Sequence, residues 1–306
     1  MLFIYLLLFS LTIVSSEENK SLIMSESLNT KDLSLHDYCR LGLDKELKEK
    51  IKQYSKTDIN SLDKAYDQTA LMACCQSSNP RSFACANILL KSGKCDINKQ
   101  DQQGFTALLY LLQNRNGSKL LHTFKKKEVN PILETKEGFS TLHYAASNSN
   151  PEILLNFLKF FSYEVKAANL VNKLPNNTDH PDHTGNTDHV SHGGTALYYA
   201  TQNHNHAGIK KLIDFNADPN LAVTASGYTP LMVANDSKSM KELILAGASL
   251  TQKSLEGHSG LKQVARVNPL LLPLVAFNKN NITYSKFFLT IGSAIALANF
   301  QNAYQK

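Results

Sequence analysis

The side chains best suited to chemistry gather in one polar segment beyond the middle of the chain. Four histidines, His180, His183, His189 and His192, fall within thirteen positions, together with several aspartates. Imidazole nitrogens and carboxylate oxygens are ligands of Zn²⁺ and related divalent cations. Their spacing matches no defined metal site, and hardly any apolar residue accompanies them. Because this composition cannot bury a core, we interpret the segment as a solvated loop, with metal binding by the four histidines as the alternative.

The rest of the chain offers no catalytic motif. It contains no Gly-x-Gly-x-x-Gly fingerprint, no P-loop, no Gly-x-Ser-x-Gly elbow and no His-Glu-x-x-His pair. No two titratable residues stand at a spacing that indicates acid–base chemistry. We therefore expect no catalytic residues and no cofactor, in a protein that is not an enzyme.

The cysteines do not form a recognisable set either. All five lie in the first third of the chain, an odd number without a Cys-x-x-Cys pair: Cys39, Cys74, Cys75, Cys85 and Cys95. A free cysteine commonly behaves as a small buried hydrophobic residue. We interpret them in that way, with a disulfide among some of them as the alternative.

Composition excludes two further classes of protein. Hydrophobic residues make up 42% of the 306 residues and charged residues 19%, which excludes a wholly disordered chain. The net charge of +6 is modest, and the longest basic run is Lys125 to Lys127. We therefore expect no nucleic-acid partner.

A Gly-x-Thr-x-Leu pattern recurs along the chain and indicates the elements that would position any site. Its Thr or Ser positions are separated by 37, 34, 55, 34 and 30 residues: Thr69, Thr106, Ser140, Thr195, Thr229 and Ser259. In five of the six copies a glycine precedes this residue and permits a positive φ in a tight turn, whereas the first copy has Asp67 in its place. The hydroxyl then caps the first amides of a helix, and the leucine points into the core. Each copy therefore predicts a turn followed by a buried helix.

This pattern resembles the ankyrin repeat, whose signature includes Thr-Pro-Leu-His-x-Ala and whose period is about 33 residues. The best matches are residues 229–234 (TPLMVA) and 140–145 (STLHYA), and the resemblance covers about residues 32–275. It implies an all-α ankyrin-repeat solenoid, in which helix–turn–helix units carry short β-hairpin fingers. We expect about seven units, of which the first and last are caps: residues 32–62, 63–98, 99–131, 132–171, 190–221, 222–252 and 253–277.

The resemblance also implies a concave face, built from hairpin tips and inner helices, that binds another protein. Phe105, Phe139 and Tyr228 follow the turn glycines and should project toward this face, where aromatic residues are common hot spots. The alternative is that these rings pack on a neighbouring hairpin. The full set of expected partner-binding residues is Phe105, Phe139, Tyr228, Gln102, Gln103, Lys136 and Glu137.

Segments outside the repeats define the domain organisation. Residues 1–16 contain an apolar run followed by small residues, which is typical of a secretory signal peptide; the alternative is translation from Met24. A polar linker follows at residues 17–31, the array occupies residues 32–277, and the histidine-rich insertion lies at about 172–192. Residues 278–306 form an apolar tail, interpreted as a helix packed on the last repeat, with membrane association as the alternative.

These features favour a secreted or periplasmic scaffold that binds a protein partner of unknown identity, exported by a microbe. The first alternative is a metal-binding periplasmic protein that uses the histidine-rich loop. The second is an adaptor tethered to a membrane by the C-terminal tail. We expect the chain to be a monomer.

The signal segment predicts cleavage after Ser16, so that the mature chain begins at Glu17. N-terminal sequencing of the native protein measures this directly. Retention of Met1 on a cytosolic product would contradict the prediction.

Overall fold

The computed structural model describes residues 33–176, 193–223 and 225–272. The signal segment, the linker and the apolar tail lie outside the described residues. The four histidines of the polar segment also lie outside them.

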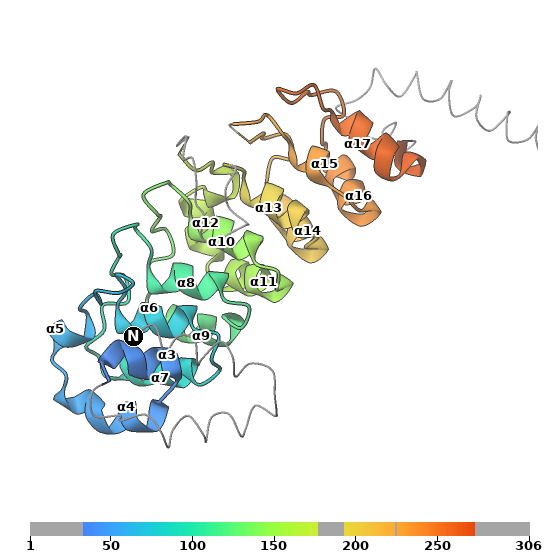
Figure 1. The fold of residues 1–306 in the computed structure, drawn as a ribbon. Helices are drawn as coiled ribbons and strands as arrows, with labels where there is room; N and C mark the ends of the chain where they lie inside the picture. The colour runs from blue at the N-terminus through green and yellow to red at the C-terminus, as the bar shows by residue number, and fades with distance from the viewer. Residues whose placement is uncertain (1–32, 177–192, 224, 273–306) are drawn as a thin grey trace, which may run out of the picture.

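The chain folds as a row of helix pairs (Figure 1), in which inner helices stack on inner helices and outer helices on outer helices. The inner helices are α3 (Leu35–Leu41), α6 (Ala70–Gln76), α8 (Ala107–Gln113), α10 (Thr141–Ser147), α13 (Ala196–Gln202), α15 (Pro230–Val233) and α17 (Gly260–Val267). The outer helices are α4 (Asp44–Lys50), α7 (Ser82–Lys91), α9 (Ser118–Lys126), α11 (Pro151–Phe160), α14 (His206–Asp214) and α16 (Ser237–Leu245). Short elements complete the row: η2 (Ile51–Gln53), α5 (Lys56–Ile59), α12 (Ser162–Ala167) and η3 (Leu170–Asn172). The all-α repeat architecture expected from the sequence is confirmed.

The repeated motif starts the inner helices as its residue types predict. Thr106 precedes α8, and its hydroxyl accepts a hydrogen bond from the backbone amide of Leu109. Thr195 caps α13 in the same way. The turn glycines before these helices have positive φ, for example 86° at Gly104. Pro230 is the first residue of α15, where the missing amide proton costs nothing.

A single core runs between the two layers of helices. The motif leucines Leu108, Leu142 and Leu197 are completely buried on the inner helices. Phe124 and Phe157 fill the space beneath the outer helices and are also completely buried. Because each repeat shares this core with its neighbours, burial of apolar surface joins the repeats along the row.

Side-chain amides join the ends of the inner helices across successive repeats. The inner helices α3, α6, α8, α10 and α13 have only seven residues each, and the last carbonyls of a helix lack intrahelical partners. In the first four of these helices, an asparagine of the next repeat donates to such a carbonyl, at 2.7 to 2.9 Å: Asn79 to Leu41, Asn114 to Cys75, Asn148 to Leu112 and Asn203 to Ser147. We call this set the amide ladder.

The loops that precede the inner helices, here called fingers, contain little regular β-structure. Within the described residues, only isolated antiparallel bridges occur, between Glu134 and Ser140 and between Lys253 and Ser259. The fingers are therefore tight turns rather than parts of a sheet. Among the described helices, none has the length and apolar character that crossing a bilayer requires.

Residues 161–176 extend the fourth repeat beyond its outer helix α11. Val165 and Leu170 are buried there against the array. The side chain of Asn172 accepts from the amide of Asp218 at 2.8 Å and donates to the carbonyl of Asn216. The first residues of the expected insertion, 172–176, are thus integrated into the array, and only the residues after them lie outside the described part.

The amide ladder predicts a large cost for replacing Asn148, which is 6% exposed. Its side chain donates to the Leu112 carbonyl and accepts from the Asn150 amide. We expect Asn148→Ala to lower the free energy of unfolding by about 1–3 kcal/mol, because a buried carbonyl loses its partner. Urea denaturation measures the change, with the exposed Asn116→Ala as the matched control, expected within about 0.5 kcal/mol of the parent. Equal stability of the two variants would refute the ladder's role.

Candidate functional site

Backbone hydrogen bonds link neighbouring fingers directly. The amide of Lys136 donates to the carbonyl of Gln103 at 2.9 Å, and the amide of Asn176 donates to the carbonyl of Glu137 at 2.8 Å. The amide of Leu255 donates to the Ser226 carbonyl at 3.0 Å in the later repeats. We call these loops together the finger row: residues 63–68, 100–105, 134–139, 225–228 and 254–258.

Close approach between fingers explains the need for glycine in the turn. A Cβ atom on Gly104 would lie 2.9 Å from the backbone nitrogen of Lys136. A Cβ atom on Gly138 would lie 2.8 Å from the backbone nitrogen of Asn176. Glycine therefore serves both the positive φ of each turn and the packing of one finger on the next.

The expected polar binding residues lie at the tips of these fingers. The backbone amide of Gln102 donates to Asp67 at 2.7 Å, and its side chain reaches the other carboxylate oxygen at 3.1 Å. Gln103 and Lys136 expose their side chains, whereas Glu137 is half-buried. The structure thus brings Gln102, Gln103, Lys136 and Glu137 together on two adjoining fingers.

Four rings pack against one another beneath these tips. The Phe105 ring lies 5.1 Å from Tyr110 and 5.4 Å from Tyr144, between centroids. The Tyr144 ring in turn lies 6.1 Å from Phe139. We call Phe105, Tyr110, Phe139 and Tyr144 the aromatic cluster. Offset or tilted pairs at such distances stabilise one another beyond simple burial.

The two phenylalanines of the cluster differ in exposure. Phe105 is half-buried and covers the cluster from the outside. Phe139 is only 9% exposed, and its ring packs edge-on against His143. The Phe139 ring therefore packs into the array in this structure instead of projecting from the finger row. Its finger closes through hydrogen bonds between Phe139 and Thr135, which turn the ring inward.

Tyr228 lies outside the aromatic cluster, in a later finger. Its hydroxyl oxygen is 2.9 Å from a carboxylate oxygen of Glu256 and 2.6 Å from Nδ1 of His258. Its ring packs on the His258 ring at 5.4 Å. The structure therefore places Tyr228 in a separate polar group that joins two C-terminal fingers.

Tyr110 and Tyr144 are the residues of this surface that the sequence motif did not reveal. Each stands four positions after the capping residue of its inner helix, as Tyr199 does in a later repeat. The hydroxyl of Tyr110 donates to Asp101 at 2.8 Å. The other oxygen of Asp101 accepts from the backbone amides of Gln103 and Phe105. One carboxylate thus holds both the finger and the ring beneath it.

His143 occupies the core rather than the surface. Its Nδ1 accepts the backbone amide proton of Ser140 at 3.0 Å, which leaves Nε2 protonated to donate to the Lys173 carbonyl at 2.9 Å. Burial lowers the pKa of His143 to about 4. A completely buried neutral imidazole with both nitrogens engaged positions the backbone of the next repeat and has no free atom for catalysis.

The described residues contain no group of three or more His, Cys, Asp or Glu side chains that could hold a metal ion. The five cysteines are free, and Cys95 alone among them is half-buried rather than buried. Burial raises the pKa of Cys85 and of Cys95 to about 12. The thiols of Cys85 and Cys95 therefore stay protonated at neutral pH, the form in which a thiol is a weak nucleophile.

Comparisons with known proteins agree with this architecture. A family model for three copies of ankyrin repeats matches residues 77–169 and 162–254. The ankyrin repeat domain of human ASB11 superposes with a TM-score of 0.55 at 21% identity, covering 75% of this chain and 90% of that chain.

Two bacterial structures are similar to a comparable extent. An ankyrin repeat domain from Acinetobacter baumannii has a TM-score of 0.52 at 23% identity, covering 70% of this chain and 98% of that chain. A chain from the complex of the Bd0816 predatory endopeptidase of Bdellovibrio bacteriovorus with immunity protein Bd3460 has a TM-score of 0.50 at 22% identity, covering 67% and 94%. No curated protein matches the sequence.

The buried His143 predicts a loss of stability in acid. Its folded pKa of about 4 lies below the ordinary value of 6.5, so between these values the unfolded chain binds a proton that the folded chain does not. We expect this residue's contribution to be constant above pH 6.5 and to fall by about 3 kcal/mol in total as the pH drops to 4. Urea denaturation at pH 7 and pH 4.5 measures the loss.

The comparison variant for this experiment is His143→Gln, which should lose less stability between the two pH values. The exposed His122→Gln on α9 serves as the control and should keep the parent's pH dependence. An unchanged pH dependence in His143→Gln would show that this imidazole does not resist protonation.

Proposed function

Because the chain belongs to the ankyrin-repeat family, we propose that it is a non-catalytic scaffold that binds a partner protein on the finger row and the adjoining inner helices. Ankyrin repeats generally mediate protein–protein interactions, and their fold is typically a non-enzymatic scaffold. The finger row lies along the inner side of the stack, where successive repeats present equivalent positions in order (Figure 1).

The observation that carries this proposal is the half-exposed Phe105 on the aromatic cluster. Its ring is supported from below by Tyr110 and Tyr144, so little side-chain entropy is lost when a partner covers it. The exposed side chains of Gln103 and Lys136 stand beside it. An apolar anchor with polar neighbours is the usual composition of a binding hot spot.

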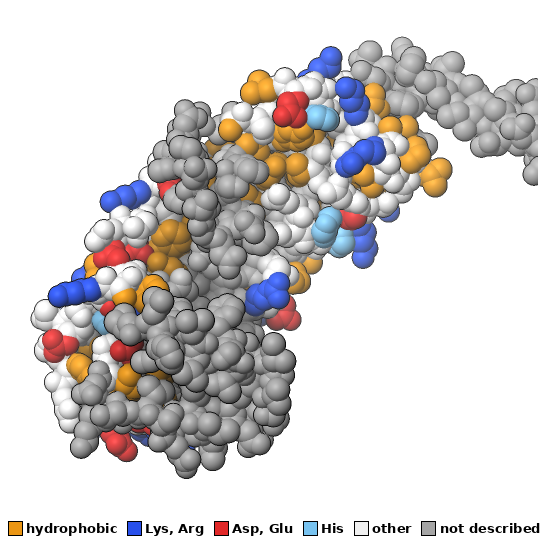
Figure 2. Space-filling view, viewed as in Figure 1, with side chains coloured by type: hydrophobic (Ala, Val, Ile, Leu, Met, Phe, Trp, Pro, Cys, Tyr) orange, Lys and Arg blue, Asp and Glu red, His pale blue; other side chains and the backbone are white. Residues whose placement is uncertain are grey.

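The C-terminal repeats extend this face. Figure 2 shows hydrophobic side chains gathered over α13, α15 and the fingers that follow, next to acidic and histidine side chains. Leu255, at a fingertip, is 81% exposed. Tyr228, Glu256 and His258 form the polar group beside it. A partner that spans both regions would contact apolar surface at each end of the row.

We also propose that the scaffold acts outside the cytoplasm, in a secreted or periplasmic location. Support comes from the sequence: an apolar run from Leu2 to Val14 precedes two serines and then Glu17 and Glu18. The identity of the partner would follow from affinity capture with the chain from residue 17 and mass spectrometry of the bound proteins.

Once a partner is captured, Phe105→Ala tests the binding face. We expect affinity to fall by about 1–3 kcal/mol, or roughly 5- to 150-fold, because a supported aromatic anchor is lost. Isothermal titration calorimetry measures the change, and circular dichroism confirms that the fold persists.

The matched control is Leu245→Ala on the outer helix α16, where the leucine is 56% exposed and away from the fingers. It should leave affinity unchanged. Full affinity in Phe105→Ala, or an equal loss in Leu245→Ala, would contradict the proposed face.

A further inference from the structure

A recess lies on the outer side of the array, between the outer helices of the first two repeats. It is a groove with a volume of about 450 Å³, formed by α4 with η2 on one wall and α7 on the other. Its lining residues are Lys48, Ile51, Lys52, Ile88, Lys91, Ser92 and Lys94. We call this recess the lysine groove.

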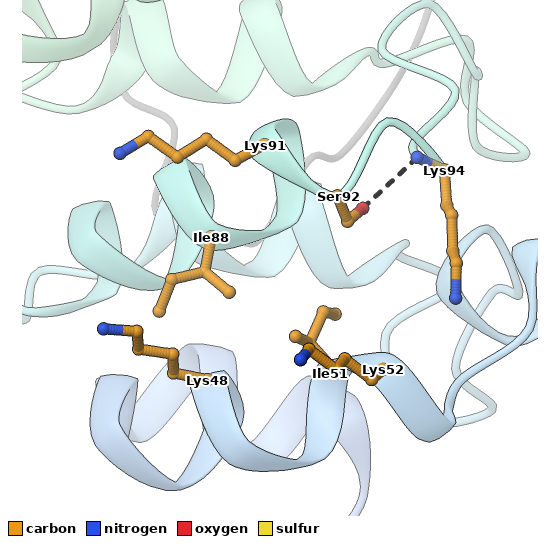
Figure 3. A pocket seen from close by; sticks show the side chains of 7 residues that line it. All are labelled: Lys48, Ile51, Lys52, Ile88, Lys91, Ser92 and Lys94. Carbon is orange, nitrogen blue, oxygen red and sulfur yellow. Dashed lines mark hydrogen bonds between the residues drawn. The ribbon is translucent and has the colours of Figure 1, made fainter.

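Ile51 and Ile88 form the apolar floor of this groove, and the lysines surround it. In Figure 3, Lys48 and Lys91 extend from facing helices to the same side of Ile88, while Lys52 stands next to Ile51. The alkyl stems of these lysines add apolar surface, and their ammonium groups remain at the rim. The groove therefore combines an apolar base with positive charge at both ends.

Within the part of the chain that the structure describes, the ammonium groups of this groove have no carboxylate partner. Lys94 donates from Nζ to the Tyr54 carbonyl at 2.7 Å. In contrast, no carboxylate among the described residues pairs with Lys48, Lys52 or Lys91. Elsewhere on the array, Lys125 pairs with Glu164 and Lys173 pairs with Glu134, each at 2.5 Å.

The spacing of these lysines causes charge repulsion in the chain when no ligand is bound. Lys48 and Lys52 stand four residues apart and face the same groove, and like charges at this spacing destabilise a helix. The helix dipole offsets part of this repulsion, because Lys91 is the last residue of α7 and a positive charge is favourable at a helix C-terminus. Neither effect supplies counter-charges, which a ligand in the groove would supply.

We propose that the lysine groove binds an acidic peptide segment of a protein partner. An apolar side chain of that segment lies on Ile51 and Ile88, and carboxylates on either side of it meet Lys48 and Lys91 at one end and Lys52 at the other. This surface is carried by outer helices, so it is independent of the finger row and adds a second point of attachment to the scaffold.

Other anionic partners fit the groove less well. A lipid bilayer presents a flat surface, whereas the apolar floor is recessed between two helices. Nucleic acid is bound through phosphate contacts together with aromatic or arginine side chains that stack on bases, and the lining contains neither. The combination of Ile and Lys instead matches an extended or helical segment that alternates apolar and acidic residues.

The test uses the full chain and a fluorescein-labelled synthetic peptide in which single leucines separate pairs of glutamates. Fluorescence anisotropy should show salt-sensitive binding, since the attraction is partly electrostatic. Lys48→Glu combined with Lys91→Glu should weaken binding by roughly tenfold or more, because two attractive contacts become repulsive.

The matched control is Lys126→Glu combined with Lys127→Glu, which changes net charge equally at exposed positions near the end of α9. It should alter affinity by less than about twofold at physiological salt. Equal weakening in both double variants would overturn the proposal, because the binding would then reflect net charge alone. Circular dichroism of each variant excludes unfolding as the cause.

Two further probes address the apolar floor and the class of partner. A peptide with serine in place of leucine should bind several-fold more weakly to the parent chain. Equal affinity for the two peptides would overturn the proposal. Binding of phosphatidylserine vesicles through Lys48 and Lys91, without binding of the leucine–glutamate peptide, would overturn it in favour of a membrane surface.

Discussion

The last carbonyl groups of the short inner helices have no hydrogen-bond partner within their own helix. The rest of the array depends on the neighbouring repeat, which supplies that partner. Stacking buries these helix ends away from water, where an unpaired carbonyl costs more than a hydrogen bond returns. Asn114 and Asn148 are placed so that each closes the helix of the repeat before it. The helix-terminal carbonyls of one repeat are thus hydrogen-bonded only when the next repeat is in place. Hydrogen bonding as well as apolar burial therefore joins successive repeats.

Hydrogen bonds between successive repeats also occur in the turns on both sides of the helices. Asn60, Asn172 and Asn220 each accept from a backbone amide one repeat further along, at Asp96, Asp218 and Ser249 respectively. The fingers add direct backbone bonds such as that from Lys136 to Gln103. A surface fixed at so many points loses little entropy when a partner binds. This rigidity is the physical link between the repeat architecture and the proposed scaffold function.

The turns and helix caps could be predicted from the sequence because they depend on residues that are neighbours along the chain. Hydroxyl caps and Pro230 act within one repeat, as does the positive φ of each turn glycine, so their residue types and spacing predicted the helices correctly. The inward turn of Phe139 and the bond from His143 to the Lys173 carbonyl depend on contacts across a repeat boundary, which a single motif does not encode. Tyr110 and Tyr144 could have been found by aligning the copies, since both stand at the same position after the cap. The lysine groove arises from two helices about forty positions apart and had no signal in local spacing.

Hydrogen exchange at the finger amides tests the central claim that the repeats present one rigid face. The amides of Lys136, Asn176 and Leu255 donate across repeat boundaries, so their protection reports on the row and not on a single helix. We predict that these amides exchange at least about a hundredfold more slowly than in an unstructured chain, equivalent to an opening free energy above about 2.7 kcal/mol. Exchange of these amides at the rate of an unstructured chain, while the helix cores stay protected, would contradict it.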